Sequence, residues 1–262
     1  MKLDQFFLRK RRRTFFIVLG VLMVAWAASA LTEFNLAKGI LSFPEAIQWA
    51  ASNFYPDAKA MSKLPQIMSK LWETLIMSIA AAAVGAVGAV VFAVLGSNTT
   101  KVNGFFSTAA RFIATLFRNV DVSAWAMVLL FSFGQSGLTG FLALLFASFG
   151  FLTRAFMETI DEVSGSSVEA LKASGAGYLS IVCRAVLPSG TPQMISWLLY
   201  MVETNIRSAT LVGILTGTGI GFSFDLYYKS LNYASASLVV LVIVMAVLVI
   251  ELISNAIRRV IV

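Results

Sequence analysis

Long apolar runs recur along the chain and are separated by short polar stretches. A helix needs roughly 20 apolar residues to cross a lipid bilayer. Runs of about that length occupy residues 14–31, 71–95, 105–133, 138–160, 191–215 and 235–257. The pattern therefore predicts an all-α integral membrane protein with about six transmembrane helices.

The third run differs from the others because polar residues interrupt it. Its apolar stretches are 105–117 and 122–133, and between them lie Arg118, Asn119 and Asp121. Such groups are costly in a bilayer unless they face protein or water. We expect either one long helix or an interfacial helix that leads into a span.

The first run can be interpreted as a span or as a cleaved signal peptide. Five basic residues at 9–13 precede it, and Ala28-Ser29-Ala30 fits the small-residue rule for signal cleavage. A signal core has only about 7–15 apolar residues, and the run at 14–31 is longer. We expect a retained span with the N-terminus in the cytoplasm. Residues 32–69, with three of the five prolines, then form an extracytoplasmic segment of short helices and turns.

Composition supports the membrane assignment and limits the chemistry. The chain is 58% hydrophobic and 13% charged, whereas soluble domains are about 45–50% apolar and about 25% charged. Its single cysteine excludes a disulfide within the chain, and it has no histidine, the usual general base and metal ligand. A P-loop sequence is also absent. We expect no catalytic residues, no metal site, no bound cofactor and no enzymatic activity.

The net charge of +7 reflects basic residues at the ends of apolar runs, which indicates membrane topology rather than nucleic-acid binding. Counting spans places both termini, the turn at 96–104 and the stretch 163–188 on one side. That side carries the basic residues 9–13 and the pair Arg258-Arg259. Basic residues favour the cytoplasmic side, so we assign these segments to the cytoplasm.

The stretch 163–188 has the polar character of a capped helix outside the bilayer. Ser166 and Glu169 have the S-x-x-E spacing of a capping box. Gly175 follows where a helix of about two turns would end in a left-handed cap. A short helix of this kind between two spans is typical of a contact with another protein.

The fifth run contains the polar residues Glu203, Asn205 and Arg207. Glu203 and Arg207 are four residues apart and can pair on one helix face. Buried charges are usually paired, so we favour an ion pair that fixes helix packing. The alternative is that Arg207 or Arg118 presents positive charge to an anion in a translocation path.

Alternating glycines at Gly217, Gly219 and Gly221 follow the fifth run. Such backbone can form an anion-binding nest. The strand–helix context of a nucleotide loop is missing here. We predict an extracytoplasmic gate or turn instead.

A family resemblance lies in the central stretch. Glu169-Ala170-Leu171, then Gly175, then Leu187-Pro188 resemble the pattern in permease subunits of bacterial ATP-binding-cassette (ABC) importers. The resemblance implies a type I importer permease (MetI-like) fold. It also implies that this stretch is a cytoplasmic coupling helix that docks in a groove of a separate ATPase subunit.

Further stretches narrow the family. Phe117-Arg118-Asn119-Val120, Glu203-x-Asn205-x-Arg207 and Gly217-x-Gly219-Ile220-Gly221 are similar to the phosphonate-type permeases. Asp121 departs from that family, which usually has proline there, and adds negative charge beside Arg118. We assign residues 70–262 to the permease domain and residues 1–69 to the basic tail, first span and extracytoplasmic segment.

The resemblance implies a multi-pass protein of the bacterial cytoplasmic membrane that works as a homodimer. It implies two ATPase subunits, which bind the ATP, and an extracytoplasmic binding protein that delivers phosphonate, phosphite or a related oxyanion. Arg118, Asn119, Glu203, Asn205 and Arg207 would then lie along the path. Two alternatives stay open: a permease for another small solute, such as methionine or another amino acid, and an ion-coupled secondary transporter with Glu203 as its carboxylate.

Overall fold

The computed structural model describes residues 2–32, 36–163 and 165–261, which are almost entirely helical. The chain divides into two units, Met1–Asn53 and Phe54–Val262. The first unit contains α1 (Lys2–Leu31), α2 (Leu36–Leu41) and α3 (Phe43–Asn53). Within α1, Arg9–Leu31 is long and apolar enough to cross a membrane, as the sequence predicts for its first span.

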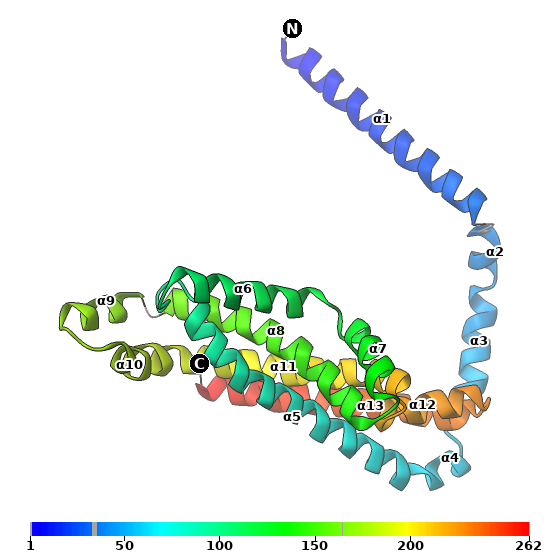
Figure 1. Ribbon diagram of the computed structural model, residues 1–262. Coiled ribbons are helices and arrows are strands. Elements are labelled where there is room, and N and C mark those ends of the chain that lie inside the picture. Colours follow the sequence, from blue (N-terminus) through cyan, green and yellow to red (C-terminus); the bar gives the residue numbers. More distant parts are fainter. Residues whose placement is uncertain (1, 33–35, 164, 262) are drawn as a thin grey trace. The chain divides into compact units, whose positions relative to one another are not determined.

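The second unit is a helical bundle (Figure 1). Its long helices are α5 (Leu64–Gly96), α8 (Gly137–Val163), α11 (Leu187–Thr216) and α13 (Tyr233–Ile261). Shorter helices complete it: α4 (Ala58–Ser62), α6 (Gly104–Asn119), α7 (Val122–Phe133), α9 (Gly165–Ala173), α10 (Tyr178–Ile181), a π-helical turn (Val182–Val186) and α12 (Gly219–Lys229). Of the long helices, α5, α8 and α13 are candidate spans by length and apolar composition.

The remaining two candidate spans of the described chain are bent. The helical segment Tyr178–Thr216 continues into α12 at an angle of 55°, and α6 meets α7 at 92°. The second angle excludes one of the two expected arrangements, a single long helix over 105–133. The other, an interfacial helix that leads into a span, stays a prediction. Val120 is extended between the two helices, and the side chain of Asp121 accepts a 2.8 Å hydrogen bond from the Ser123 N–H. Asp121 therefore starts a new helix as its N-cap.

The helix α8 is the centre of the bundle, where it contacts α5, α6, α7 and α11. Small residues make the contact with α5 close: Ala81, Gly85 and Ala89 are buried. A Cβ atom added to Gly85 would lie only 3.1 Å from Cβ of Ser148. In lipid, helices associate mainly through such packing and through hydrogen bonds, because burial from lipid gives little hydrophobic gain.

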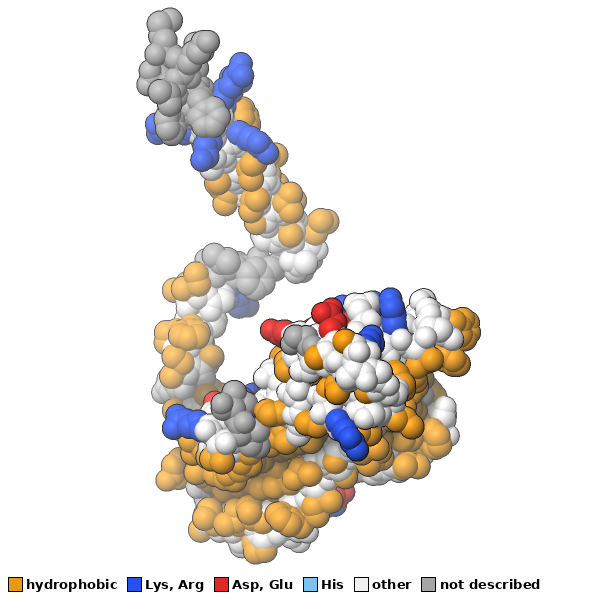
Figure 2. Space-filling view, turned by 90° about the vertical axis from the view of Figure 1, so that its left-hand side faces the viewer, with side chains coloured by type: hydrophobic (Ala, Val, Ile, Leu, Met, Phe, Trp, Pro, Cys, Tyr) orange, Lys and Arg blue, Asp and Glu red, His pale blue; other side chains and the backbone are white. Residues whose placement is uncertain are grey.

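Charged groups surround the end of the bundle that carries α9. Figure 2 views the molecule from that side, with lysine, arginine, aspartate and glutamate side chains around this end and hydrophobic side chains over much of the flank. Such a distribution fits a bundle whose flank faces lipid and whose end faces water.

Candidate functional site

The helix α9 has one apolar side, which anchors it to the bundle. Val168 is 1% exposed. It belongs to an apolar cluster that includes Ile181 and Val186, and Leu171 packs against this cluster. The outward side is different, since Glu169, Ala170 and Lys172 are exposed. A second protein can therefore contact α9 without displacing the residues that attach it.

A glycine cap ends α9, as the spacing predicts. Gly175 has a φ of +79°. Its N–H donates to the Lys172 carbonyl at 3.0 Å, and the N–H of Ala176 donates to the Leu171 carbonyl at 3.0 Å. These two bonds form a Schellman motif. The side chain of Ser166 lies outside the described residues, so the capping box stays a prediction.

The chain returns to the bundle through α10 and the π-helical turn. Leu187 is half-buried and Pro188 is exposed in the first turn of α11. Proline is accommodated there because the first N–H groups of a helix have no partner within the helix. The predicted coupling residues thus occupy one continuous segment from α9 to the start of α11. Their contact with an ATPase stays a prediction.

The break between α6 and α7 presses directly against α8. A Cβ atom on Gly150 would overlap the backbone of Phe117 and Arg118. The ring of Phe117 stacks on Trp125 of α7 at 5.1 Å and meets Phe146 of α8 edge-on at 5.1 Å. Gly150 is the central residue of α8, a candidate span. Packing therefore fixes the bend. It lies beside α8, level with the middle of that helix.

A polar cleft opens beside this bend. Its volume is about 330 Å³, and its lining residues are Thr115, Arg118, Asn119 and Arg154. Thr115, Arg118 and Asn119 are exposed on α6. Arg154 comes from α8, where its Nε donates to Glu158 Oε1 at 2.7 Å. The cleft brings the two predicted path residues Arg118 and Asn119 together with a second guanidinium.

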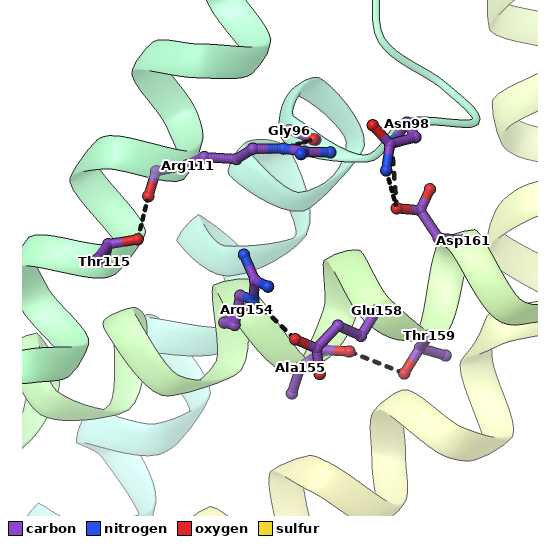
Figure 3. Close-up of polar contacts among 9 residues, drawn as sticks. All are labelled: Gly96, Asn98, Arg111, Thr115, Arg154, Ala155, Glu158, Thr159 and Asp161. Carbon is purple, nitrogen blue, oxygen red and sulfur yellow. Dashed lines mark hydrogen bonds and ion pairs between the residues drawn. The ribbon is translucent and has the colours of Figure 1, made fainter.

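Figure 3 shows the polar contacts of Thr115 and Arg154, two residues of this cleft, and of Arg111 and Asp161 nearby. Thr115 donates its hydroxyl to the Arg111 carbonyl at 2.7 Å, and Arg111 donates Nε to the Gly96 carbonyl at 2.8 Å. Arg111 thereby supplies a partner to the end of α5. Separate polar contacts thus border the apolar packing of α6 on α8, in which Ala110 and Ala114 are buried.

Glu203 forms the ion pair predicted from its spacing to Arg207. Arg207 Nη1 lies 2.9 Å from Glu203 Oε1, and Arg258 Nη2 of α13 lies 3.7 Å from Glu203 Oε2. The Glu203 side chain is 12% exposed, whereas that of Arg207 is 49% exposed. Glu203 is therefore held between two cations of different helices. Arg207 can face a path while it stays paired.

Asn205 does not fit the predicted role of a path-lining residue. It is 1% exposed. Its Nδ2 donates to Ser148 Oγ at 2.8 Å and to the Ser78 carbonyl at 3.3 Å. Glu203 and Arg207 are each two residues away from Asn205 along α11, so they lie on another face of the helix. Asn205 connects α11 with α8 and α5 inside the bundle.

The three glycines form a buried turn between α11 and α12. Gly217 has a φ of +70° and caps α11, and Gly219 has a φ of +60°. A Cβ atom on Gly221 would overlap the Thr210 carbonyl of α11. The Ile220 N–H donates to Thr74 Oγ1 at 2.9 Å. The turn is thus packed tightly against α5 and α11, which favours a turn over an open anion-binding nest.

The sequence did not predict that Arg154 lines the cleft with Arg118, or that Arg258 lies beside Glu203. The spacing of Arg154 and Glu158 indicates an ion pair but not the helix that faces them. Nothing in the sequence connects Arg258 with Glu203. The place of Arg154 beside α6 and the contact of Arg258 with Glu203 depend on which helices are neighbours in the bundle.

Residues 89–262 match the family of binding-protein-dependent transport system inner membrane components. The chain belongs to this family. The permease is 30% identical to the phosphite transport system permease protein PtxC of Stutzerimonas stutzeri, over 93% of this chain and 86% of that one. It is 29% identical to the phosphate-import permease protein PhnE of Mycolicibacterium smegmatis, over 72% of this chain and 35% of that longer protein.

The fold of the permease is also known from solved structures. An inward-facing structure of the MetNI methionine ABC transporter superposes with a TM-score of 0.66 at 18% identity, covering 75% of this chain and 96% of that chain. The predicted MetI-like fold and the resemblance to importer permeases of the phosphite and phosphonate type are therefore confirmed. Membership of this family argues against an ion-coupled secondary transporter.

Proposed function

We propose that this chain is the transmembrane permease subunit of an ATP-driven importer for phosphite, phosphonate or a related phosphorus oxyanion. The observation that carries the substrate class is the 30% identity to a phosphite permease over 93% of this chain. The methionine transporter shares the fold at only 18% identity. An amino-acid substrate is therefore the weaker alternative.

Transport by this chain needs partners. The working unit is two copies of the permease, two ATPase subunits that bind the ATP, and an extracytoplasmic binding protein. Both termini and α9 lie in the cytoplasm. The exposed residues Glu169 and Ala170 contact the ATPase, while the buried Val168 joins α9 to the bundle.

This arrangement supports a mechanical coupling. Closure of the ATPase pair pushes α9, whose apolar side packs on the π-helical turn that leads into α11. The long helix α11 transmits the displacement to the packed glycine turn at Gly217, Gly219 and Gly221. A loaded binding protein stabilises the same conformational change from the other side of the membrane.

Uptake of radiolabelled phosphite by vesicles that contain the assembled transporter tests the proposal. The variant Glu169→Lys should lose at least tenfold in ATP-dependent uptake with an unchanged amount of permease in the membrane. Glu73→Lys is the matched control, since Glu73 is exposed near the start of α5 and its one ion pair among the described residues is with Lys70, at 2.7 Å. Unchanged uptake in Glu169→Lys would contradict the coupling role. Absence of phosphite, phosphonate and phosphate uptake in the wild type would contradict the substrate class.

A further inference from the structure

The cleft beside the α6–α7 bend contains positive charge that the fold does not neutralise. Arg118 has no ion-pair partner among the described residues. The nearest carboxylate in sequence, Asp121, is committed elsewhere, since it accepts the Ser123 N–H at the start of α7. An exposed guanidinium at the depth of Gly150 is costly in a bilayer unless it faces water or an anion.

The second guanidinium of the cleft is held loosely. Arg154 pairs with Glu158 on the same helix, and their side chains are 42% and 63% exposed. Exposed pairs of this type contribute little to stability, so an anion can compete with Glu158 for Arg154. Glu158 keeps Arg154 directed along α8 until such an anion arrives.

The other lining groups suit a small oxyanion. Asn119 offers an amide with two N–H donors. Thr115 already donates its hydroxyl to the Arg111 carbonyl, so its oxygen is left as an acceptor for a protonated oxygen of the ligand. Arginine forks bind phosphate oxygens in pairs, with geometric as well as electrostatic preference. The volume of about 330 Å³ lies at the small end of the range for ligand sites.

We infer that this permease has a substrate site of its own, in which Arg118, Arg154 and Asn119 bind a tetrahedral phosphorus oxyanion midway through the bundle. The inference rests on the proposed function, because it takes the transported anion as the ligand. The phosphate of a lipid headgroup has the same chemistry and is the competing source. The mid-depth position opposite Gly150 favours the free anion, since headgroups lie at the membrane surface.

Binding to the full-length permease in micelles of a maltoside detergent, which contains no phosphate, tests the site directly. Titration with phosphite, methylphosphonate and inorganic phosphate should give saturable binding to the wild type. Arg118→Gln and Arg154→Gln should each weaken this binding at least tenfold, and Arg118→Lys should lose less. Arg184→Gln is the matched control, because Arg184 is exposed on the π-helical turn away from the cleft. Glu158→Gln should strengthen binding several-fold by releasing Arg154, a gain that a purely structural role would not give.

Unchanged binding in both arginine variants would overturn the inference, and so would binding of the free anions that is abolished when phosphatidylglycerol is added to the micelles. A folding defect in one arginine variant is detected by its melting temperature, and the other variant then decides. The assembled transporter separates this inference from the proposed function. No phosphorus oxyanion uptake by the wild type refutes the function, whereas normal uptake by both arginine variants refutes only the site.

Discussion

The hydroxyl of Ser97 donates a 2.6 Å hydrogen bond to the carboxylate of Asp161, which joins the turn after α5 to the end of α8. The same carboxylate accepts four more hydrogen bonds, two from Asn98 and two from Thr99. Asp161 lies four residues before Gly165, where α9 begins. The network therefore fixes the base from which the predicted coupling helix extends.

Asp161→Asn should destabilise the permease, because a neutral amide replaces a charged acceptor of five hydrogen bonds. The loss should be about 2 kcal/mol in the free energy of unfolding, as is typical for hydrogen bonds to a charged group. Thermal unfolding in detergent micelles measures it. Glu162→Gln is the control, since Glu162 is exposed and should change stability by less than about 0.5 kcal/mol. Equal melting temperatures for the two variants would show that the network contributes nothing.

Gly150→Ala should disturb the bend, because the added methyl group would overlap the backbone of Phe117 and Arg118. Backbone cannot rotate away as a side chain can, so we expect a cost of about 1–3 kcal/mol. The melting temperature of the purified permease reports the loss. Gly137→Ala in the same helix has no heavy atom within 4 Å of the added methyl group and should be neutral or stabilising. A Gly150→Ala protein as stable as Gly137→Ala would contradict this close contact.

Removing the partner of Asn205 should weaken the bundle modestly. Ser148→Ala eliminates the 2.8 Å bond to the Asn205 amide and leaves only the longer bond to the Ser78 carbonyl. Hydrogen bonds between membrane helices average about 0.6 kcal/mol and reach about 1.7 kcal/mol. A double-mutant cycle with Asn205→Leu, followed by unfolding in mixed micelles, isolates the pair. The exposed Asn255 provides a control, and Asn255→Leu should show no coupling to Ser148→Ala.

Glu203→Ala should be more damaging than Arg207→Ala. Removal of Glu203 leaves Arg258 partly buried without its nearest carboxylate, whereas removal of Arg207 leaves Glu203 with Arg258 at 3.7 Å. Uncompensated buried charge costs several kcal/mol in protein interiors, about 3–5 when one partner of a buried pair is lost. The amount of folded permease in the membrane and its melting temperature rank the two variants.

The charge exchange Glu203→Arg with Arg207→Glu gives a further test of the same cluster. The exchange restores the pair on α11 but places a second arginine near Arg258 of α13. We therefore expect incomplete rescue. Additional replacement of Arg258 by glutamine should improve it. Full rescue by the exchange alone would show that Arg258 takes no part.

Several parts of this structure could be predicted because they depend on local sequence. Helices of sufficient apolar length follow from hydropathy, as in α8 and α13. The cap at Gly175 follows from its spacing after Glu169, since a left-handed residue is needed where the helix ends. The pair of Glu203 and Arg207 follows from helical periodicity.

Other parts could not be predicted, because they depend on which helices are neighbours. The polar residues at 118–121 indicated an interruption, but neither the bend of 92° nor its close contact with Gly150 is encoded locally. From the sequence, Asn205 had the same predicted role as Glu203 and Arg207. It is two residues from each of them along α11, so its side chain points to another side of the helix, where it contacts Ser148. The cleft needed Arg118 and Arg154 from separate helices.

The helix break at Val120 also has an electrical consequence. Moving an anion into a cell with a negative interior costs about 2.3 kcal/mol per charge for each 100 mV of membrane potential. Arg118 lies opposite Gly150, the central residue of α8. At the proposed site, an anion held there would have crossed only part of the voltage drop. The guanidinium groups lower its energy at that point. In the proposed mechanism, the break thus divides one voltage-dependent barrier into two smaller ones.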